Sequence, residues 1–401
     1  MEIIGLRGFA PPPKNLCVRR GFIPTRKAMY SGGLSKTFDI SLDEEAEGKV
    51  MPFEWFPFTL GWELTLACNL RCKHCGSNAG QARKNELTTD EAIQLCDQFP
   101  SLLVQEVDFT GGEPLLRSDW PEIALRLKEL NISTGFVTNG VTLHQETVSK
   151  LKETGISHIA VSVDGLESTH DFIRGKNGVY HEIMKGIKRL IEENIPTTII
   201  TTVTELNIDE LPTLFEIFSD IGIDRWRPQP LISSGRVEDF QELRIKEKTF
   251  LKLIDFYQDW GYKAIDGGIE LLRADGLGYY FEPDISRGPW YGCPAGLVSV
   301  GITSDGKVKG CLSLQDKFIE GDLRKNSLWD IWFDDNTFSY TRHFSTKMLG
   351  DNCDSCDKGE QCRGGCSAMS YGYTGIPHSD PLCYIGIMKR KEVTDSWAEN
   401  K

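Results

Sequence analysis

The 401-residue sequence lacks three features that would each place it in a broad class of protein. It has no run of 18 apolar residues, the length that crosses a bilayer as a helix. Its first residues, MEIIGLRGFAPPPKN, lack the basic, apolar and small-residue order of a signal peptide. It also lacks a net positive charge, because 58 acidic residues outnumber 45 basic ones and give a formal net charge of -13. We therefore expect a cytoplasmic protein that binds neither membranes nor nucleic acid.

The sequence also lacks low-complexity segments and repeats of fixed period. With 40% hydrophobic and 26% charged residues it is an ordinary globular chain, and its length predicts more than one domain. Residues 1–57 form an N-terminal extension in which a basic arm precedes the acidic run DEEAEG. We interpret this arm either as a solvated tail or as a contact for a partner or substrate.

Apolar, β-branched runs alternate with helical patterns between residues 58 and 230, as in a parallel sheet with crossover helices. The segment TTDE, Thr88 to Glu91, predicts a helix that begins with a capping box. Apolar residues at Ile183, Ile187 and Leu190 predict an amphipathic helix. Six β/α units result, with strands at 58–66, 104–110, 132–138, 157–163, 196–204 and 223–228.

Three short motifs follow directly on predicted strands: GGEP after the second, the end of VTNG after the third and the end of SVDG after the fourth. In open sheets and β/α barrels, ligands bind at the carboxyl ends of the strands. We therefore expect these motifs to share one rim of the sheet with the loop after the first strand.

Twelve cysteines are too many to be explained as disulfides in a reducing compartment. Cys68, Cys72 and Cys75 have the spacing C-x3-C-x2-C on the loop after the first predicted strand. A structural zinc site is normally closed by a fourth protein ligand. A four-iron cluster held by three thiolates instead keeps one iron open. We favour the open iron, with a zinc knuckle as the alternative.

This cysteine loop, followed by GGEP, resembles the radical S-adenosylmethionine (SAM) enzymes over about residues 58–230. The resemblance implies an α/β fold built on a partial (β/α)6 barrel. In that family the amine and carboxylate of SAM chelate the open iron. An electron then cleaves SAM to a 5'-deoxyadenosyl radical, which abstracts hydrogen from a substrate.

The resemblance also implies the residues that contact SAM. Ser162 and Arg174 match positions that contact its carboxylate, and Asn139 is a neighbour of its ribose. The family usually has an aromatic residue before the third cysteine, where this chain has His74. Catalytic acids and bases are not assigned, because the cofactor carries the radical chemistry. The motif that holds the SAM amino group corresponds to Gly111, Gly112, Glu113 and Pro114, with Thr110 beside it.

Seven further cysteines near the C-terminus have the spacing C-x17-C, then C-x2-C-x5-C-x3-C-x16-C. These intervals match the SPASM domain of radical SAM enzymes. The resemblance implies two auxiliary 4Fe-4S clusters, which with the SAM-binding cluster make three. One auxiliary cluster would be held by Cys353, Cys356, Cys362 and Cys383, and the other by Cys293, Cys311 and Cys366.

The second auxiliary set is one ligand short. Its fourth corner is either open to a substrate or closed by water, by Asp305 or by Cys17. Zinc is the alternative metal for the whole tail, although a gap of five residues between cysteine pairs is short for a zinc ribbon. Cys96, on a predicted helix, is expected to be a buried small hydrophobe.

SPASM enzymes mostly modify peptides, so the resemblance implies an oxidoreductase that crosslinks or oxidises a ribosomally made peptide. The first alternative is an enzyme of the haem-pathway type that decarboxylates or trims tetrapyrrole side chains. An anaerobic sulfatase maturase is disfavoured, because that group has a catalytic Asp where this chain has Leu312. The non-enzymatic alternative is an iron-sulfur electron carrier.

The expected partners follow from the same resemblance. They are a peptide substrate, an electron donor such as flavodoxin or ferredoxin, and a separate leader-peptide-binding protein, since 57 residues are few for such a domain. The expected domains are the extension 1–57, the barrel 58–245, a linking helical region 246–284 and the SPASM domain 285–401.

Two groups near these motifs have open roles. Arg225, Arg227 and Gln229 alternate on the sixth strand, where they could bind a carboxylate in the barrel mouth or form a solvated edge opposite a packed Trp226. Trp290 and Tyr291 precede the first auxiliary cysteine and are expected to line the site or to pack at the domain junction.

Overall fold

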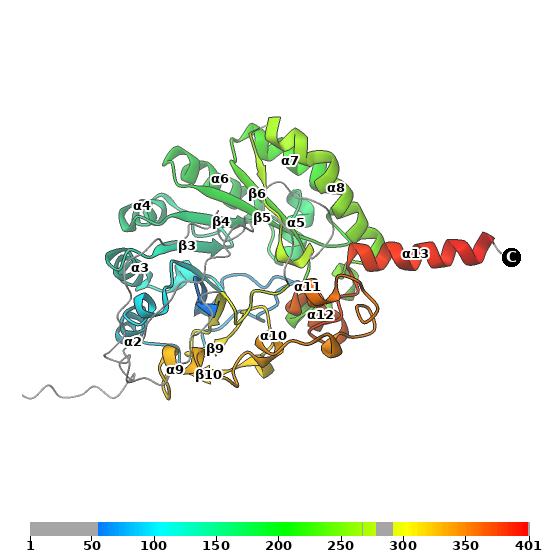
Figure 1. Cartoon of the computed structure of the whole chain (residues 1–401). Helices are drawn as coiled ribbons and strands as arrows, with labels where there is room; N and C mark the ends of the chain where they lie inside the picture. Colours follow the sequence, from blue (N-terminus) through cyan, green and yellow to red (C-terminus); the bar gives the residue numbers. More distant parts are fainter. Residues whose placement is uncertain (1–54, 267, 278–291, 400–401) are drawn as a thin grey trace, which may run out of the picture.

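The computed structural model describes residues 55–266, 268–277 and 292–399 (Figure 1). The N-terminal extension with Cys17 therefore lies outside the described residues, as do Trp290 and Tyr291. The described part of the chain is built around one curved ten-stranded sheet with the order β10-β9-β8-β1-β2-β3-β4-β5-β6-β7.

The six predicted β/α strands are present and pair in parallel, each with the next in sequence. Their ends differ from the predicted ones by at most two residues, and the largest shift is at the sixth strand, which runs from Arg225 to Pro230. The strands are β1 (Thr59–Thr65), β2 (Glu106–Gly111), β3 (Ser133–Thr138), β4 (His158–Ser162), β5 (Thr197–Val203) and β6 (Arg225–Pro230).

Most of the helices that follow these strands lie on the outer side of the curved sheet (Figure 1). The predicted capping box is confirmed, because the Thr88 hydroxyl accepts from the Glu91 N–H and the Glu91 carboxylate accepts from the Thr88 N–H. Cys96 ends the same helix and is fully buried, as expected. The helices are α2 (Thr89–Cys96), α3 (Trp120–Glu129), α4 (Gln145–Thr154), α5 (Glu167–Arg174), α6 (Val179–Glu192), α7 (Leu211–Asp220) and α8 (Glu247–Asp266).

Alternation along the strands separates a helix-facing side from an inner side. Trp62, Phe109 and Phe136 are fully buried, and their rings meet edge to face under the helices. Their neighbours in sequence face the inside of the barrel, where β1 and β2 place Glu63 opposite Thr110. The sequence therefore forms a sheet with an apolar outer face and a polar inner one.

The C-terminal region continues the barrel sheet instead of forming a separate one. Strand β8 (Ser299–Ile302) pairs in parallel with β1, and β9 (Lys307–Lys309) and β10 (Gly321–Asp322) follow in antiparallel. The buried Glu63 carboxylate ties the two regions, because it accepts from the Ser304 hydroxyl at 2.8 Å and pairs with Arg83 at 2.7 Å. The remaining helices are α9 (Leu328–Trp332), α10 (Ser339–Arg342), α11 (Gly359–Cys362), α12 (Ser367–Thr374) and α13 (Tyr384–Glu399).

The predicted linking region 246–284 is not helical throughout. It contains α8, but β7 (Glu270–Leu271) then pairs in parallel with β6 and covers part of its edge. On β6, Trp226 is fully buried in an aromatic cluster with Phe218 and Phe256. This packing fits the interpretation of the strand as a solvated edge opposite a packed Trp226. Arg225 is exposed and pairs with Glu270 at 3.5 Å.

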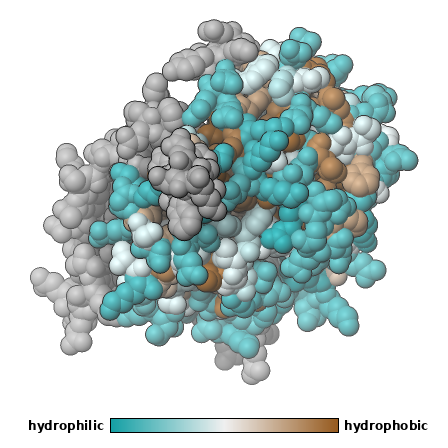
Figure 2. Space-filling view, turned by 90° about the vertical axis from the view of Figure 1, so that its right-hand side faces the viewer, coloured by the Kyte–Doolittle hydropathy of each residue, from teal (hydrophilic) through white to brown (hydrophobic). Residues whose placement is uncertain are grey.

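Hydrophilic side chains dominate the face of the molecule in Figure 2, and the hydrophobic ones form small groups among them. Within the described residues, no helix is both long and apolar enough to cross a membrane.

Candidate functional site

The first cysteine loop begins immediately after β1. Its backbone turns tightly, since the Cys75 N–H donates to the Cys72 carbonyl at 3.3 Å and the Asn78 N–H donates to the Cys75 carbonyl at 3.4 Å. The thiols of Cys68, Cys72 and Cys75 line one cavity and influence each other electrostatically. Burial raises the pKa of the Cys68 and Cys72 thiols. The loop thus gathers three thiols in a partly enclosed place.

Arg236 follows the last barrel strand, β6, in the sequence and bonds to this loop. Its role was not identified from the sequence. Its guanidinium donates to the Cys72 carbonyl at 2.9 Å and to the Ala79 carbonyl at 3.0 Å. The backbone N–H of Arg236 donates to the Cys75 carbonyl. The preceding Gly235 has φ +64°, and a Cβ there would lie 2.4 Å from the Cys75 carbonyl oxygen. The Gly-Arg pair in SSGR was the only sequence signal for this contact.

The GGEP turn follows β2 and packs directly against the cysteine loop. Gly111 has φ +126°, and a Cβ at Gly112 would lie 2.2 Å from the Ala67 carbonyl oxygen. Both positions therefore require glycine. Gly111 needs it for its positive φ, and Gly112 needs it because the segment at Ala67 passes so close. The Gly112 and Glu113 N–H groups donate to the Thr65 and Ala67 carbonyls at 2.8 Å.

The Glu113 carboxylate is fully buried and turns toward β3. It accepts from the Thr138 hydroxyl at 2.8 Å, from the Asn139 N–H at 2.8 Å and from the Leu115 N–H at 3.2 Å. Burial raises the pKa of Glu113 to about 7, against the opposing effect of these three donors. In this arrangement Glu113 joins the ends of β2 and β3.

A buried charged group lies beside the cysteine loop, centred on Asp164. Its carboxylate, which has no exposed surface, pairs with Arg174 at 2.6 Å and with His74 at 3.1 Å. Burial alone would raise the pKa of Asp164, but Arg174 and His74 outweigh burial and lower it. Arg174 also donates to the Cys72 sulfur at 3.8 Å. The guanidinium therefore stabilises a thiolate at Cys72.

His170 and His74 contact Asp164 in different ways. Burial and the Arg174 charge lower the pKa of His170 to about 4, so this ring is neutral at pH 7 and its Nδ1 accepts from the Asp164 N–H at 3.0 Å. His74 lines the cavity, and its buried Nδ1 has no hydrogen-bond partner among the described residues. The pairing of His74 with Asp164 was not anticipated, because the two residues are 90 positions apart in the sequence.

The cavity brings together most of the predicted SAM contacts. Of the predicted positions, Glu113 and Pro114 do not line the cavity, since both are buried behind it. Asn139 reaches the loop, because its side-chain Nδ2–H donates to the Asn69 side-chain oxygen Oδ1 at 2.7 Å and to the Cys68 sulfur at 3.7 Å. Besides the cysteines, the cavity is lined by the predicted Thr110, Gly111, Gly112, Asn139, Ser162 and Arg174, together with His74 and Arg236.

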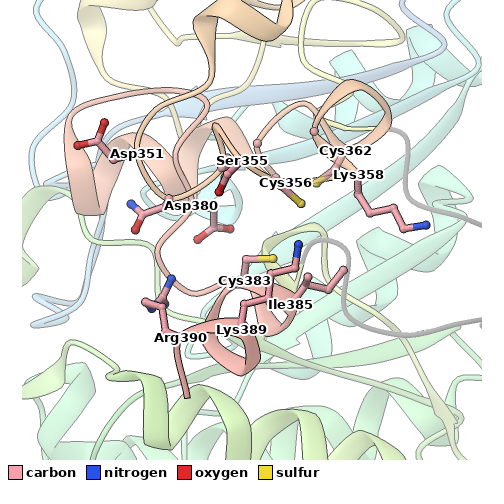
Figure 3. Close-up of a pocket in the computed structure, with 16 residues that line it drawn as sticks. Asp351, Ser355, Cys356, Lys358, Cys362, Asp380, Cys383, Ile385, Lys389 and Arg390 are labelled. Carbon is pink, nitrogen blue, oxygen red and sulfur yellow. The ribbon is translucent and has the colours of Figure 1, made fainter. Parts of the chain in front are cut away.

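The four-cysteine set near the C-terminus surrounds a second cavity (Figure 3). The labelled sulfur atoms of Cys356, Cys362 and Cys383 face the same space, and Cys353 also lines it. Asp380 is buried on the same wall, where burial raises its pKa to about 7, and its carboxylate accepts from the Leu382 N–H at 2.9 Å. The four cysteines that the resemblance assigns to one cluster therefore line a single cavity.

The remaining three cysteines form the third group. The Cys293 thiol interacts electrostatically with Cys311 and lies near Ser367, which follows Cys366. Asp305 does not belong to this group, because it lies at the tip of the β8–β9 hairpin, where it accepts from the Thr303 hydroxyl at 2.7 Å. Cys311 lies at the other end of that hairpin, beside Gly301.

All eleven cysteines in the described part of the chain are thiols and none forms a disulfide. Burial raises the pKa of Cys353 and Cys362 to about 12, so metal binding must displace their protons. Three groups of buried or half-buried thiols fit iron-sulfur clusters, for which thiolate is the usual protein ligand. A lone zinc ion would leave unexplained the Gly-Gly turn and the buried Arg174 beside the first group.

Comparisons with known proteins agree with this geometry. The radical SAM superfamily profile matches residues 62–218, and the SPASM iron-sulfur cluster-binding domain matches residues 293–363. An AdoMet-dependent heme synthase of Methanosarcina barkeri is 30% identical, over 82% of this chain and 96% of that protein. A mycofactocin maturase of Mycolicibacterium smegmatis is also 30% identical, over 82% of this chain and 83% of that protein.

Among solved structures, SuiB of Streptococcus suis bound to S-adenosylmethionine has the same fold. The TM-score is 0.68 with 21% sequence identity, over 82% of this chain and 77% of that one. The two matched profiles and the relatives that are 30% identical over most of their length agree with the cavity of Cys68, Cys72 and Cys75. The chain is a radical SAM enzyme with a C-terminal SPASM domain.

Proposed function

We propose that this enzyme cleaves SAM to a 5'-deoxyadenosyl radical and abstracts hydrogen from a peptide, giving a crosslinked or oxidised product. The observation that carries the proposal is the cavity at the barrel rim, where three thiols, the Gly-Gly turn and Arg174 lie together. Cleavage of SAM by an electron is the chemistry that the bound cluster supplies there.

Different residues of the cavity would bind the cluster and the different parts of SAM. Cys68, Cys72 and Cys75 would hold the cluster, and the open corner would take the amine and carboxylate of SAM. Arg174 and Ser162 offer donors to that carboxylate. The backbone of Gly111 and Gly112 can approach the amine because neither residue has a side chain. We assign to Glu113 the role of bracing this turn from behind, in place of direct contact with SAM.

The C-terminal cysteines would hold two auxiliary 4Fe-4S clusters, for a total of three clusters. The buried groups Cys353, Cys356, Cys362, Cys383 and Cys293, Cys311, Cys366 support two separate sites. Such clusters can accept an electron from a substrate radical, which makes the net reaction oxidative. We retain the proposed boundaries at residues 58–245 for the barrel and 285–401 for the cluster-bearing region, although β8 and β1 share one sheet.

A peptide substrate is supported by the similarity to a mycofactocin maturase. A tetrapyrrole substrate is the second candidate, because a heme synthase is equally similar and is matched over 96% of its length. A sulfatase-maturase reaction is disfavoured by Leu312, whose side chain lies over Gly61 on the inner face of the barrel and offers no carboxylate. A flavodoxin or ferredoxin is the proposed electron donor, and a separate protein is proposed to bind the leader of the peptide.

The first experiment tests SAM cleavage. The full-length protein is reconstituted with iron and sulfide without oxygen, reduced with dithionite and assayed for 5'-deoxyadenosine. We expect the product from the wild type and none from Cys72→Ala. The matched control is Cys96→Ala, which removes a buried thiol outside the three cysteine groups and is expected to keep its iron and its product. A fully loaded wild type without product would favour an electron carrier.

The second experiment separates the two substrates. Deuterated forms of a candidate ribosomally made peptide and of a propionate-bearing tetrapyrrole are each added to the reaction. Deuterium in 5'-deoxyadenosine identifies the molecule whose hydrogen is abstracted. Transfer from the tetrapyrrole alone would replace the peptide proposal with the second candidate.

A further inference from the structure

The site of Cys293, Cys311 and Cys366 supplies three thiols, whereas a four-iron cluster has four corners. Asp305 is excluded by its place at the far tip of the hairpin. Another oxygen lies closer. The Tyr340 side chain is 91% buried, and its hydroxyl has no hydrogen-bond partner among the described residues. A buried hydroxyl without a partner is costly, so its position requires a reason.

The Tyr340 hydroxyl lies beside the residue that precedes Cys311. A Cβ added at Gly310 would be only 2.2 Å from the hydroxyl oxygen, so glycine at this position makes room for the phenol. The hydroxyl also interacts electrostatically with the Cys293 and Cys311 thiols. Cys293 also lies near Ser367, the residue that follows the third cysteine. The phenol oxygen therefore lies close to the Cys293 and Cys311 thiols, in the region where the chain also places Cys366.

The Tyr340 side chain is held in this position by its surroundings. Its ring meets Phe318 edge to face, with 5.1 Å between ring centroids. Its backbone carbonyl lies 2.7 Å from Nε2 of the buried His378, whose Nδ1 lies 2.7 Å from the Arg363 carbonyl. Because Arg363 follows Cys362, this histidine connects Tyr340 to the four-cysteine site. The phenol is thus fixed before any ligand arrives.

We propose that Tyr340 is the fourth protein ligand of the auxiliary cluster held by Cys293, Cys311 and Cys366, binding its remaining iron through the phenolate oxygen. An Fe–O bond forms and the phenol O–H bond breaks, with the proton released to solvent during cluster assembly and no change in oxidation state. This inference rests on the two auxiliary clusters of the proposed function. It closes that cluster to substrate, so the cluster can transfer electrons without binding the substrate.

Glu320 is a rival ligand that carries a charge. Its carboxylate interacts electrostatically with Tyr340, but it accepts a hydrogen bond from the Phe338 N–H and is attracted by Arg342. Its oxygens therefore already have favourable contacts, whereas the Tyr340 hydroxyl lacks one within the described residues. The phenol gains a partner by binding iron, and the carboxylate would have to give one up.

Resonance Raman spectroscopy of the reconstituted full-length protein tests the proposal. An iron-bound phenolate shows enhanced ring vibrations, which shift when the protein contains ring-deuterated tyrosine. We expect these bands in the wild type and their loss in Tyr340→Phe. The matched control is Tyr371→Phe, which makes the same change in a residue that packs on the same Phe318 ring and should keep the bands. Gly310→Ala should also abolish them, because the added methyl group occupies the place of the phenol oxygen.

Iron analysis separates the two levels of the argument. About 12 irons per chain are expected for three four-iron clusters, and a substantially lower value in the wild type would refute the cluster count of the proposed function. Full iron content without phenolate bands would overturn only the assignment of Tyr340. Bands that survive in Tyr340→Phe would do the same.

Discussion

The Asp164–Arg174 pair offers the sharpest test of how the site is held together. Both side chains are at least 92% buried and their charged atoms are 2.6 Å apart. Removal of one partner from a buried ion pair leaves an uncompensated charge and typically costs about 3–5 kcal/mol. We therefore expect Asp164→Asn and Arg174→Gln each to lower the free energy of unfolding by about that amount.

The double variant distinguishes this explanation from a general loss of packing. Since neither charge is then left alone, the two changes together should cost about 2–3 kcal/mol less than the sum of the single changes. The measurement is urea unfolding of the reduced, metal-free protein, followed by tryptophan fluorescence and far-UV circular dichroism. Costs that add within about 0.5 kcal/mol would refute the reasoning, because independent sites behave in that way.

An exposed ion pair of similar length provides the control. Lys152 and Glu193 are 2.7 Å apart on the surface, with side chains 57% and 31% exposed. Water screens such a pair, so Lys152→Gln should leave the urea midpoint unchanged within error. Arg174→Gln should also weaken SAM binding to the loaded protein, whereas Lys152→Gln should not.

Two further predictions concern residues around the same cavity. Glu113 has its pKa raised from 4.5 to about 7, so its proton favours the folded state at acid pH, and this contribution of about 3 kcal/mol is lost as pH rises from 4.5 through 7. Between pH 5 and pH 8 the wild type should therefore lose stability relative to Glu113→Gln, and parallel pH profiles in urea unfolding would contradict this. Arg236→Gln removes charged hydrogen bonds to the Cys72 and Ala79 carbonyls, each worth about 1.5–3 kcal/mol. It should speed the loss of iron from the first cluster to a chelator, and an unchanged rate would show that the loop holds itself.

The sequence by itself determined the barrel and predicted the cysteine groups. The strands were predictable because apolar, β-branched runs alternate with helical patterns, and each such run must be buried on a sheet. The capping box at Thr88 and the amphipathic pattern of α6 are likewise local signals, and both are confirmed. The cysteine spacings could be interpreted for the same reason, because the short stretch of chain between two ligands limits how far apart they can lie.

The tertiary structure decided the contacts between residues distant in sequence. No sequence motif near His74 indicates its pairing with Asp164, and the Gly-Arg pair in SSGR does not by itself identify the Cys72 loop as the partner of Arg236. The orientation of Glu113 was also not readable, because a carboxylate in GGEP can face the cavity or the strand behind it, and only the donors at Thr138 and Asn139 settle the matter.

The junction between the barrel and the C-terminal cluster-bearing region was likewise decided by the tertiary structure. A SPASM domain is expected from residue 285, and within the described residues its strand β8 pairs with β1 while Ser304 donates to Glu63 across 241 positions. Hydrogen bonds between strand edges depend on which backbones are brought together and hardly on side-chain identity, so no local pattern encodes them. The chain therefore specifies its elements and its ligands locally, whereas packing alone determines how they surround the site.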